Sequence, residues 1–337
     1  MAIQVGIIGP GDVARLHVDA LRAAGARVTA VAGLTQGSAE EFAARHEIPS
    51  AIVGADALLC RKDVDAVVIA TPSPMHAAQS LAALEAGKHV LCEIPVGMSA
   101  VESLQVAEKC RRTGLSVMVA HTLRFADPWL RLRAEIAHGR ITVRHIILRR
   151  TMMRRANKNW SGRPRSWYDS IVWHHGAHQV DLALWLLQGD CPDASQVTVS
   201  GLVGPLWEGN NQPMDLGATL RVADRGLVSL SLSYHSSVPV EDALIIADEA
   251  TFTVYGGKIL KAVDCTTVAP ASFDVGGTPA DARPGDLEVA ETDRMKFSAL
   301  QAQDAEFVAA VREGRMPRSS VQDVQATMQI LERLAGT

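Results

Sequence analysis

The chain has 337 residues, of which 47% are hydrophobic and 21% are charged, and its formal net charge is −4. This composition is typical of a folded protein of about two domains and excludes a mainly disordered or fibrous chain. The chain has no apolar run of about 18 residues that would span a membrane, no signal-like start and no Cys-x-x-Cys pair. We therefore expect a cytoplasmic protein without disulfides or membrane contact.

The first 120 residues alternate short apolar runs with amphipathic stretches, which is the rhythm of βαβ units. The expected strands are 3–8, 28–32, 66–70, 89–92 and 116–120, and the expected helices are 38–46, 75–85 and 101–112. Ser38 and Ser99 are the expected N-caps, and Gly87 ends the second helix. We predict an α/β domain with a doubly wound parallel sheet over residues 1–123.

The first predicted strand runs into Gly9-x-Gly11-x-x-Ala14 and then into a helical pattern. Gly9 allows the tight turn, Gly11 lets the backbone approach a pyrophosphate, and Ala14 lets the helix pack closely on the strand. The helix N-terminus then faces the phosphates, so we expect Gly9, Gly11, Asp12 and Val13 to bind a dinucleotide in a Rossmann fold. The alternative is an ordinary strand-to-helix turn that uses glycine for its conformation.

The end of the second predicted strand bears on the choice of cofactor. Proteins that bind NAD place an acid about 20 residues after the glycine turn, where it binds the ribose hydroxyls. Residues 33–38 read Gly-Leu-Thr-Gln-Gly-Ser, with no acid. Thr35 and Ser38 can donate hydrogen bonds to a 2′-phosphate, and no carboxylate repels it, so we expect NADP, with NAD as the alternative.

Beyond residue 123 the pattern changes to longer, β-branched runs. The expected strands are 141–148, 197–203, 216–222, 227–234 and 250–255, with a hairpin turn at 223–226. A helix over 174–187 interrupts them, and helices over 298–312 and 321–334 end the chain. We predict a second domain, residues 124–337, of α+β class with a large, open and mainly antiparallel sheet.

Basic residues gather in one segment of the chain. Residues 140–165 include nine Lys and Arg residues and no Asp or Glu. A domain that binds nucleic acid is usually basic throughout, whereas one basic segment in an acidic chain favours a small anionic ligand. We therefore expect a small-molecule substrate and no nucleic acid. The alternative for each arginine is a solvated surface position.

The helix predicted in the second domain starts with three histidines. On a regular helix His174, His178 and Asp181 lie at positions i, i+4 and i+7 and share one face. A neutral imidazole suits the removal of a hydroxyl proton, so His178 is the expected catalytic base and His174 the second candidate. Two histidines at i and i+4 can also bind zinc, but we expect no metal. His174 and His175 can instead cap the helix or pack in the core.

Three further strings join the glycine turn: Ala-Thr-Pro-Ser-Pro-Met-His at 70–76, Ala-Gly-Lys-His-Val-Leu-Cys-Glu-Ile-Pro at 86–95, and His-His-Gly-Ala-His-Gln-Val-Asp-Leu at 174–182. With the glycine turn they resemble the glucose-fructose oxidoreductase and inositol dehydrogenase family (Gfo/Idh/MocA) over the whole chain. The resemblance implies hydride transfer with a nicotinamide and an open sheet that makes contacts in an oligomer, here expected to be a homodimer. It also implies that five residues line the nicotinamide side of the cofactor site: Thr71, Pro72, His76, Glu93 and Pro95.

The chain departs from the family at Ile94, where most members carry a catalytic lysine. Isoleucine can neither bond to a substrate hydroxyl nor move its proton. One branch shares this isoleucine, and the chain resembles it also at 121–122, 124–125, 154–155, 162, 164–167, 173–175 and 178. That branch implies the breakdown of aromatic acids, in which the cyclic hemiacetal of a dicarboxylated semialdehyde is oxidised to a lactone.

Because guanidinium groups bind carboxylates in pairs of hydrogen bonds, this resemblance implies a substrate-binding set. Its members are Arg124, Arg154, Arg155, Arg165, Trp167 and His175. The tryptophans between residues 160 and 185 can instead belong to the core. Two other functions stay open: a sugar, inositol or polyol dehydrogenase of the same family, and a regulator that binds the cofactor without catalysis.

Overall fold

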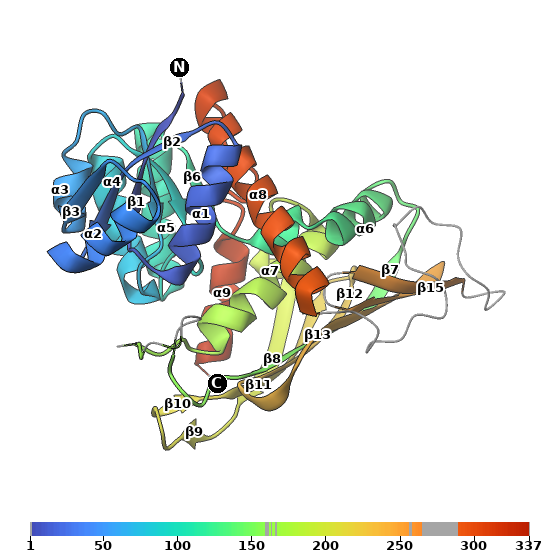
Figure 1. Ribbon diagram of the computed structural model, residues 1–337. Coiled ribbons are helices and arrows are strands. Elements are labelled where there is room, and N and C mark those ends of the chain that lie inside the picture. Colours follow the sequence, from blue (N-terminus) through green and yellow to red (C-terminus); the bar gives the residue numbers. More distant parts are fainter. Residues whose placement is uncertain are drawn as a thin grey trace. The chain divides into compact units, whose positions relative to one another are not determined.

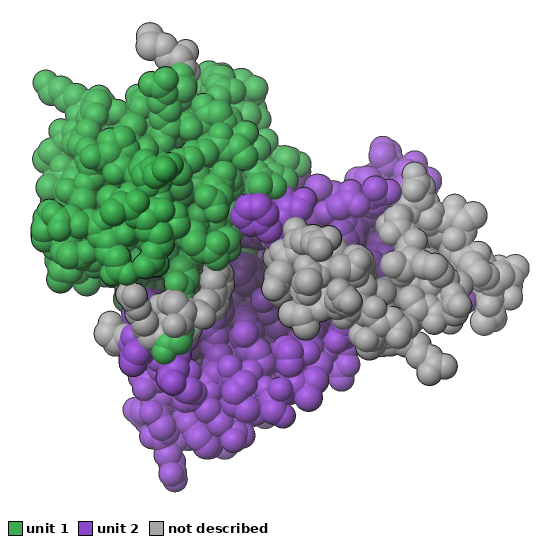
Figure 2. All heavy atoms as spheres, in the orientation of Figure 1, with its two compact units in different colours: residues 1–121, 159–162, 300–328 green, residues 122–158, 163–299, 329–337 purple. Residues whose placement is uncertain are grey.

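The computed structural model describes residues 2–158, 162, 164–165, 167–255, 258–264 and 289–336. The chain divides into two compact units (Figure 2): unit 1 comprises residues 1–121, 159–162 and 300–328, and unit 2 comprises residues 122–158, 163–299 and 329–337. Apart from residues 159–162, the chain thus leaves unit 1 after residue 121 and returns to it at residue 300. The division into two domains after residue 123 stays a prediction.

Unit 1 is built on a six-stranded parallel sheet (Figure 1). Its strands are β1 (Gln4–Ile8), β2 (Arg27–Gly33), β3 (Ser50–Val53), β4 (Ala66–Ile69), β5 (His89–Cys92) and β6 (Val117–Val119), in the order β3-β2-β1-β4-β5-β6. This is the strand order of a doubly wound Rossmann sheet, so the predicted fold of the first part is confirmed. All residues of β4 are buried, because helices cover both faces of a parallel sheet.

Five helices connect the strands of unit 1. They are α1 (Asp12–Ala23), α2 (Gln36–Arg45), α3 (Ala55–Leu59), α4 (His76–Glu85) and α5 (Ala100–Thr113). The Ser99 hydroxyl accepts from the Glu102 amide at 3.1 Å, and Gly87 follows α4 with a φ of 75°, as predicted. Ser38 is not the cap of α2, because Thr35 takes that role and accepts from the Ser38 amide at 3.2 Å. The short β3 and α3 have no clear periodicity and were not predicted.

The end of the chain returns to unit 1 and pairs with β6. The amides of Val119 and Val321 donate to the carbonyls of Ser319 and Val117 at 2.8 and 3.0 Å. The predicted helix over 321–334 begins later, as α9 (Gln325–Ala335), because Ser320 pairs with Met118 of β6 and residues 321–324 form a turn.

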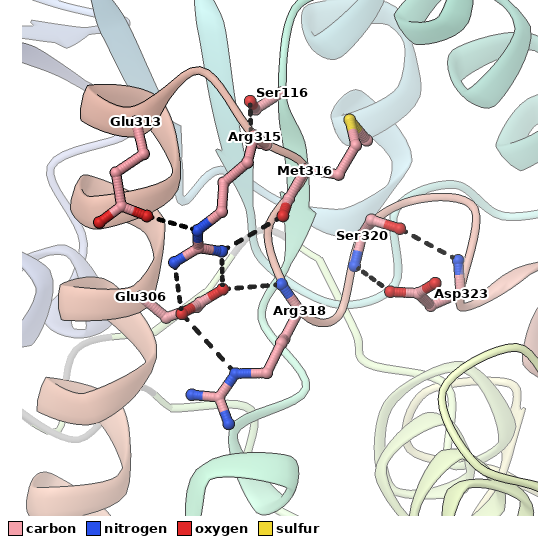
Figure 3. A network of polar contacts seen from close by, with 8 residues as sticks. All are labelled: Ser116, Glu306, Glu313, Arg315, Met316, Arg318, Ser320 and Asp323. Carbon is pink, nitrogen blue, oxygen red and sulfur yellow. Dashed lines mark hydrogen bonds and ion pairs between the residues drawn. The ribbon is translucent and has the colours of Figure 1, made fainter.

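A polar network holds the C-terminal half of α8 (Val289–Glu313) in place (Figure 3). The Arg315 guanidinium binds Glu306 and Glu313 of α8, each at 2.6 Å. The Ser116 hydroxyl, next to β6, donates to the Arg315 carbonyl at 3.2 Å. Ser320 and Asp323 close the turn before α9, with the Ser320 amide donating to the Asp323 carboxylate at 2.8 Å. These contacts fix the part of α8 that belongs to unit 1.

Unit 2 is built on a seven-stranded mixed sheet in the order β15-β14-β13-β7-β12-β11-β8. The strands are β7 (Val143–Met153), β8 (Val197–Val203), β11 (Asp215–Val222), β12 (Gly226–Ser233), β13 (His235–Ala247), β14 (Ala250–Tyr255) and β15 (Lys258–Asp264). Only the pair β7 and β12 is parallel among the pairings of these strands. The predicted α+β class with a mainly antiparallel sheet is confirmed, as is the hairpin turn between β11 and β12.

One face of this sheet is covered and the other is open. Along β11 the buried Leu216, Ala218, Leu220 and Val222 alternate with more exposed residues, as on a sheet with one solvated face. The helix α7 (Ala177–Gln188) packs on β7 and β12, and α6 (Asp127–Ala137) packs on α7. A small pair, β9 (Leu206–Trp207) and β10 (Gln212–Pro213), lies outside the main sheet. None of the helices in the described parts of the chain is both long and apolar enough to span a membrane.

Candidate functional site

The turn between β1 and α1 requires glycine at its first position. Gly9 has a φ of 99°, and its amide donates to the Ala32 carbonyl at 3.0 Å. A Cβ atom at Gly9 would lie 2.6 Å from the Ala70 carbonyl oxygen at the end of β4. Both the conformation and the close approach therefore exclude any other residue here.

The second glycine places no side chain at the N-terminus of α1. Gly11 is the N-cap of α1, and a Cβ atom there would meet only the Ala70 oxygen, at 3.9 Å. Asp12 and Val13 form the first turn, half-buried, and Ala14 is fully buried against the sheet. A bare backbone at the positive end of a twelve-residue helix fits a pyrophosphate. These residues therefore fit the pyrophosphate of a dinucleotide.

Thr35 and Ser38, predicted to bind a 2′-phosphate, lie at the start of α2 and bond to each other. The Thr35 hydroxyl donates to the Ser38 hydroxyl at 3.0 Å, and the Ser38 hydroxyl donates to the Thr35 carbonyl at 2.9 Å. Leu34, just before them, is 81% exposed. The end of β2 thus offers hydroxyls and a helix N-terminus, and no acid between residues 33 and 38.

His76 joins the loops that follow β4 and β5. Its ring nitrogens lie 2.8 Å from the Thr71 carbonyl and 2.7 Å from the Pro95 carbonyl, and its side chain is buried. Thr71 donates to Gln79 at 2.6 Å, and Pro72 precedes the short 3₁₀ turn that leads into α4. His76 therefore holds the walls of the predicted nicotinamide site together, and both of its nitrogens already face protein oxygens.

A second histidine, which the sequence reasoning missed, also contacts the loop after β5. His17 of α1 is fully buried between two carboxylates: its Nδ1 lies 2.8 Å from Asp304 of α8 and its Nε2 lies 2.9 Å from Glu93. The other oxygen of Glu93 accepts from the Ile94 amide at 3.2 Å. His17 lies three residues after Ala14 on α1, and this place next to the glycine turn could have drawn attention to it. Its partner Asp304 lies 287 residues away in the sequence, so the pair itself could not be predicted.

The protonation of His17 follows from these contacts. An ionised carboxylate accepts hydrogen bonds only, so two such bonds need two N–H groups on the ring. Burial alone lowers the pKa of His17, but the charges and hydrogen bonds of Asp304 and Glu93 outweigh it and raise this pKa to about 10. Burial raises the pKa of Asp304, and the charge and hydrogen bond of His17 oppose that rise. With both acids ionised, His17 is an imidazolium at neutral pH.

We expect the free energy of unfolding to fall as the pH rises from 7 to 9. The pKa of His17 is raised from 6.5 to about 10 in the folded chain, so its stabilisation is complete below pH 6.5 and is lost toward pH 10. The loss should reach about 1 kcal/mol or more over this range, measured by urea unfolding at each pH. The Asp304→Asn variant should show a smaller dependence, and an equal slope in both proteins would contradict the assignment.

The candidate catalytic residues of unit 2 lie where a π-helical turn, Val172–Gly176, leads into α7. His174 Nδ1 lies 2.6 Å from the Tyr234 hydroxyl, and the rings of His174 and His178 are 6.1 Å apart. The predicted regular helix over 174–187 is therefore wrong in its first turn, where the backbone is π-helical. Such turns are frequent at functional sites.

Asp181 and Arg124 form a buried ion pair next to this turn. Two guanidinium nitrogens of Arg124 donate to the two Asp181 oxygens at 2.8 and 2.6 Å. Arg124 is 3% exposed and Asp181 1%, so this pair is part of the interior of unit 2. The substrate-binding role of Arg124 stays a prediction, but in the structure its guanidinium is held by Asp181.

Burial keeps two of the histidines neutral. Desolvation is the main cause that lowers the pKa of His174 well below 6.5, and the same cause lowers that of His175. His175 is 1% exposed and packs edge-on against the Tyr234 ring, with the ring centres 4.9 Å apart. His175 thus takes the packing role that the sequence left open, and its predicted contact with substrate stays a prediction.

Arg154 and Arg165 converge on one carboxylate in unit 2. Arg154 and Arg165 both bind the Oδ2 atom of Asp169, the latter at 2.7 Å, and Arg165 also donates to Asn157 at 3.1 Å. Burial raises the pKa of Asp169, whereas the charges of Arg154 and Arg165 and the hydrogen bond from Arg165 lower it. Arg154 lies over the Tyr234 ring, 5.4 Å from its centre. Two arginines thus share one negative charge beside the histidines.

The two remaining predicted substrate contacts lie on the same segment. Arg155 is exposed, donates to His235 at 3.1 Å and lies over the Trp207 ring at 5.2 Å. Trp167 is half-buried and faces the Arg165 guanidinium, 5.3 Å from the ring centre. Asp169 and Tyr234 were not predicted, because a single acid and a single tyrosine carry no pattern.

Acids from other parts of the chain neutralise much of the basic segment over residues 140–165. The ion pairs in this segment are Arg140 with Glu135, Arg144 with Asp248, Arg149 with Asp242, and Arg150 with Glu241. The last three acids lie on β13 or just after it, and β13 pairs with β7. Within the described residues, no group of three or more His, Cys, Asp or Glu side chains is placed to hold a metal.

Comparisons with known proteins cover both parts of the chain. Residues 3–121 match the oxidoreductase family with an NAD-binding Rossmann fold (GFO_IDH_MocA), and residues 128–267 match the C-terminal domain of bacterial oxidoreductases. The chain is 30% identical, over 98% of both chains, to a 4-carboxy-2-hydroxymuconate-6-semialdehyde dehydrogenase of Sphingobium sp.. It is 28% identical to an inositol 2-dehydrogenase of Paenarthrobacter aurescens, over 93% of this chain and 92% of that one.

A solved structure shows the same fold over the full length. An oxidoreductase domain protein from Kribbella flavida superposes with a TM-score of 0.84 at 21% identity, over 100% of this chain and 96% of that chain. The likeness therefore includes both sheets and the return of the chain to unit 1.

Proposed function

The chain belongs to the Gfo/Idh/MocA family of NAD(P)-dependent oxidoreductases, and we propose that it oxidises the cyclic hemiacetal of 4-carboxy-2-hydroxymuconate-6-semialdehyde to 2-pyrone-4,6-dicarboxylate. The observation that carries the proposal is the pair Arg154 and Arg165, which share one carboxylate oxygen of Asp169. One positive charge is left in excess, next to the His174 and Tyr234 pair. Such a place suits a substrate that carries carboxylates beside its reacting carbon.

Ile94 supports the same substrate. It is 5% exposed and occupies the position of the lysine that most members of the family carry. A buried isoleucine offers no hydrogen bond to a polyol hydroxyl, which disfavours the inositol and sugar reactions. The relative of Sphingobium sp. acts on the proposed semialdehyde by its name, and its similarity covers 98% of both chains.

The proposed reaction begins with the closed ring. The hemiacetal carbon carries both a hydrogen that can leave as hydride and a hydroxyl whose proton can be removed, whereas the open aldehyde lacks that hydroxyl. A nicotinamide dinucleotide held by the turn after β1 would supply the hydride acceptor. His178 takes the hydroxyl proton, so that the hydride and the proton leave the ring and the C–O bond becomes the lactone carbonyl.

The other residues of the proposed site bind the substrate or orient the catalytic histidines. Tyr234 fixes the ring of His174 through its hydroxyl, and His174 is the second candidate for the base. Arg154, Arg155 and Arg165 bind the two carboxylates, and Trp167 faces the guanidinium of Arg165. Gly9, Gly11 and the first turn of α1 hold the pyrophosphate.

A reduction assay tests the substrate. Freshly made ring-fission product is mixed with the enzyme and with NADP or NAD in parallel, and formation of the reduced cofactor is followed by absorbance. We expect turnover with the dicarboxylate and little with myo-inositol. Faster turnover of myo-inositol would establish the polyol reaction instead, and turnover of neither compound would favour a regulator that binds cofactor.

For the cofactor we propose NADP, with NAD as the weaker alternative. Leu34 is 81% exposed at the end of β2, so an aspartate there would not disturb the fold. Leu34→Asp should shift the ratio of kcat/KM toward NAD by about tenfold, because the carboxylate repels a 2′-phosphate. Leu104→Asp, at a leucine of α5 that is 50% exposed, is the matched control. A wild-type preference for NAD of about a hundredfold would contradict the proposal.

We further propose a cytoplasmic homodimer that does not bind nucleic acid. The solvated face of the seven-stranded sheet exposes Leu202 of β8, at 74%. Light scattering coupled to size-exclusion chromatography gives the mass in solution, and a monomer at micromolar concentration would contradict the dimer.

A further inference from the structure

His17 is a strong feature of unit 1 that the proposed reaction does not use. It is fully buried, and its two ring nitrogens contact the carboxylates of Asp304 and Glu93 at 2.8 and 2.9 Å. A charged ring so placed costs desolvation, which only good geometry on both sides offsets. Apolar side chains would stabilise the core equally well. We therefore expect the charged group of His17, Asp304 and Glu93 to have a role other than stability.

The role is indicated by what Glu93 holds. One Glu93 oxygen contacts His17 and the other accepts from the Ile94 amide at 3.2 Å, so the carboxylate fixes its own backbone where the chain leaves β5. The Pro95 carbonyl is fixed in turn by His76, at 2.7 Å. The backbone from Glu93 to Pro95 is thus held at both ends by a histidine.

This backbone belongs to the edge of the sheet where a dinucleotide binds. The carboxyl ends of β1, β4 and β5 are neighbours, and ligands of such sheets bind beyond these ends. Gly9 lies against Ala70 at the end of β4, and His76 connects the loop after β4 to the loop after β5. A shift of the β5 loop would therefore change the wall opposite the glycine turn.

We propose that His17 is a positioning residue for the nicotinamide cofactor: bridged between Asp304 and Glu93, it fixes the backbone at Glu93–Pro95 against which the cofactor binds. The inference rests on the proposed cofactor contact at Glu93 and Pro95. Asp304 contributes by holding the ring of His17 toward Glu93, and Arg315 helps to fix α8 through Glu306 and Glu313 (Figure 3).

The groups whose charge acts on His17 within the described residues are Asp304, from α8, and Glu93, from the loop after β5. Deprotonation of the ring leaves one of its two nitrogens without a hydrogen to donate. The two carboxylates then lose their common counter-charge, and the β5 loop loses its anchor. Cofactor affinity should therefore decrease at high pH.

The test measures the dissociation constants of NADPH and NADH by fluorescence titration of the full chain, from about pH 7 to about pH 10.5. In the wild type we expect affinity to fall as the pH approaches 10. His17→Asn should weaken binding by about tenfold at pH 7.5 and remove the pH dependence, since a misplaced wall costs affinity. In Asp304→Asn the loss of cofactor affinity should occur at a lower pH, because the pKa of His17 is then raised by Glu93 alone.

His89→Asn is the matched control. His89 lies in the same unit on β5, and its ring accepts from the Ser116 amide at 3.0 Å, away from Glu93. It should lower stability while leaving cofactor affinity within about twofold. Equal affinities of the His17 and His89 variants, or an unmoved pH profile in Asp304→Asn, would overturn the role of His17. If the His17 variant does not fold, the profiles of the wild type and Asp304→Asn decide. A wild type that binds neither cofactor would instead refute the proposed cofactor site.

Discussion

Replacement of His178 by Asn is expected to lower kcat by roughly 10² to 10⁴, the usual contribution of a general base. Asparagine keeps a polar group of similar size but cannot take up the hydroxyl proton. The residues predicted to bind the cofactor lie in unit 1, so the dissociation constant of the cofactor should stay nearly unchanged. Steady-state kinetics and a separate binding titration distinguish the two effects.

His174→Asn is the comparison variant, because His174 lies next to His178 and binds Tyr234. An unchanged kcat in His178→Asn together with a large loss in His174→Asn would transfer the role of base to His174. If His174 is the base, the dependence of kcat on pH also changes. Desolvation lowers the pKa of His174 well below 6.5, so the rate would fall only at pH values well below 6.5.

Replacement of Arg165 by Leu is expected to lower kcat/KM for the dicarboxylate by about 30-fold or more, because loss of a buried charge-assisted pair costs on the order of 2 to 5 kcal/mol. Arg165 is only 13% exposed, and Asn157 and Asp169 hold its guanidinium in one orientation. A carboxylate of the substrate therefore meets a group that is already ordered, beside Arg154. The measurement is kcat/KM for the dicarboxylate at saturating cofactor.

Arg140→Leu is the control for charge alone. Arg140 is 53% exposed and pairs with Glu135 on α6, so its removal should change kcat/KM by less than about threefold. Equal losses in the two variants would mean that the arginines act only as a diffuse field, and the specific anchor would have to be abandoned. A thermal unfolding scan of each variant separates loss of fold from loss of binding.

The regular parts of the fold follow from local patterns. Each of these patterns lies within a short stretch of the chain: the glycine spacing at residues 9–14, and the apolar runs of β1, β2, β4, β5 and β6. The parallel sheet and its glycine turn were therefore predictable. The helix α6 was not predicted. The strands that were not predicted include the short β3 and the whole of β13, in whose first half Pro239 and Glu241 interrupt the apolar pattern. Their pairing with neighbouring strands decides their structure.

By itself the sequence determined the fold class, the glycine turn, the family strings and the histidines at the start of α7, because each depends on residues close together in the chain. Only the tertiary structure decided which charges meet. Arg149 finds Asp242 across 93 residues, and His17 finds Asp304 across 287. The sequence does not show which charges form ion pairs, because pairing depends on their distance in space after folding. That is why the basic segment read as a surface for anions, whereas folding neutralises much of it and leaves Arg154 and Arg165 with a single shared carboxylate.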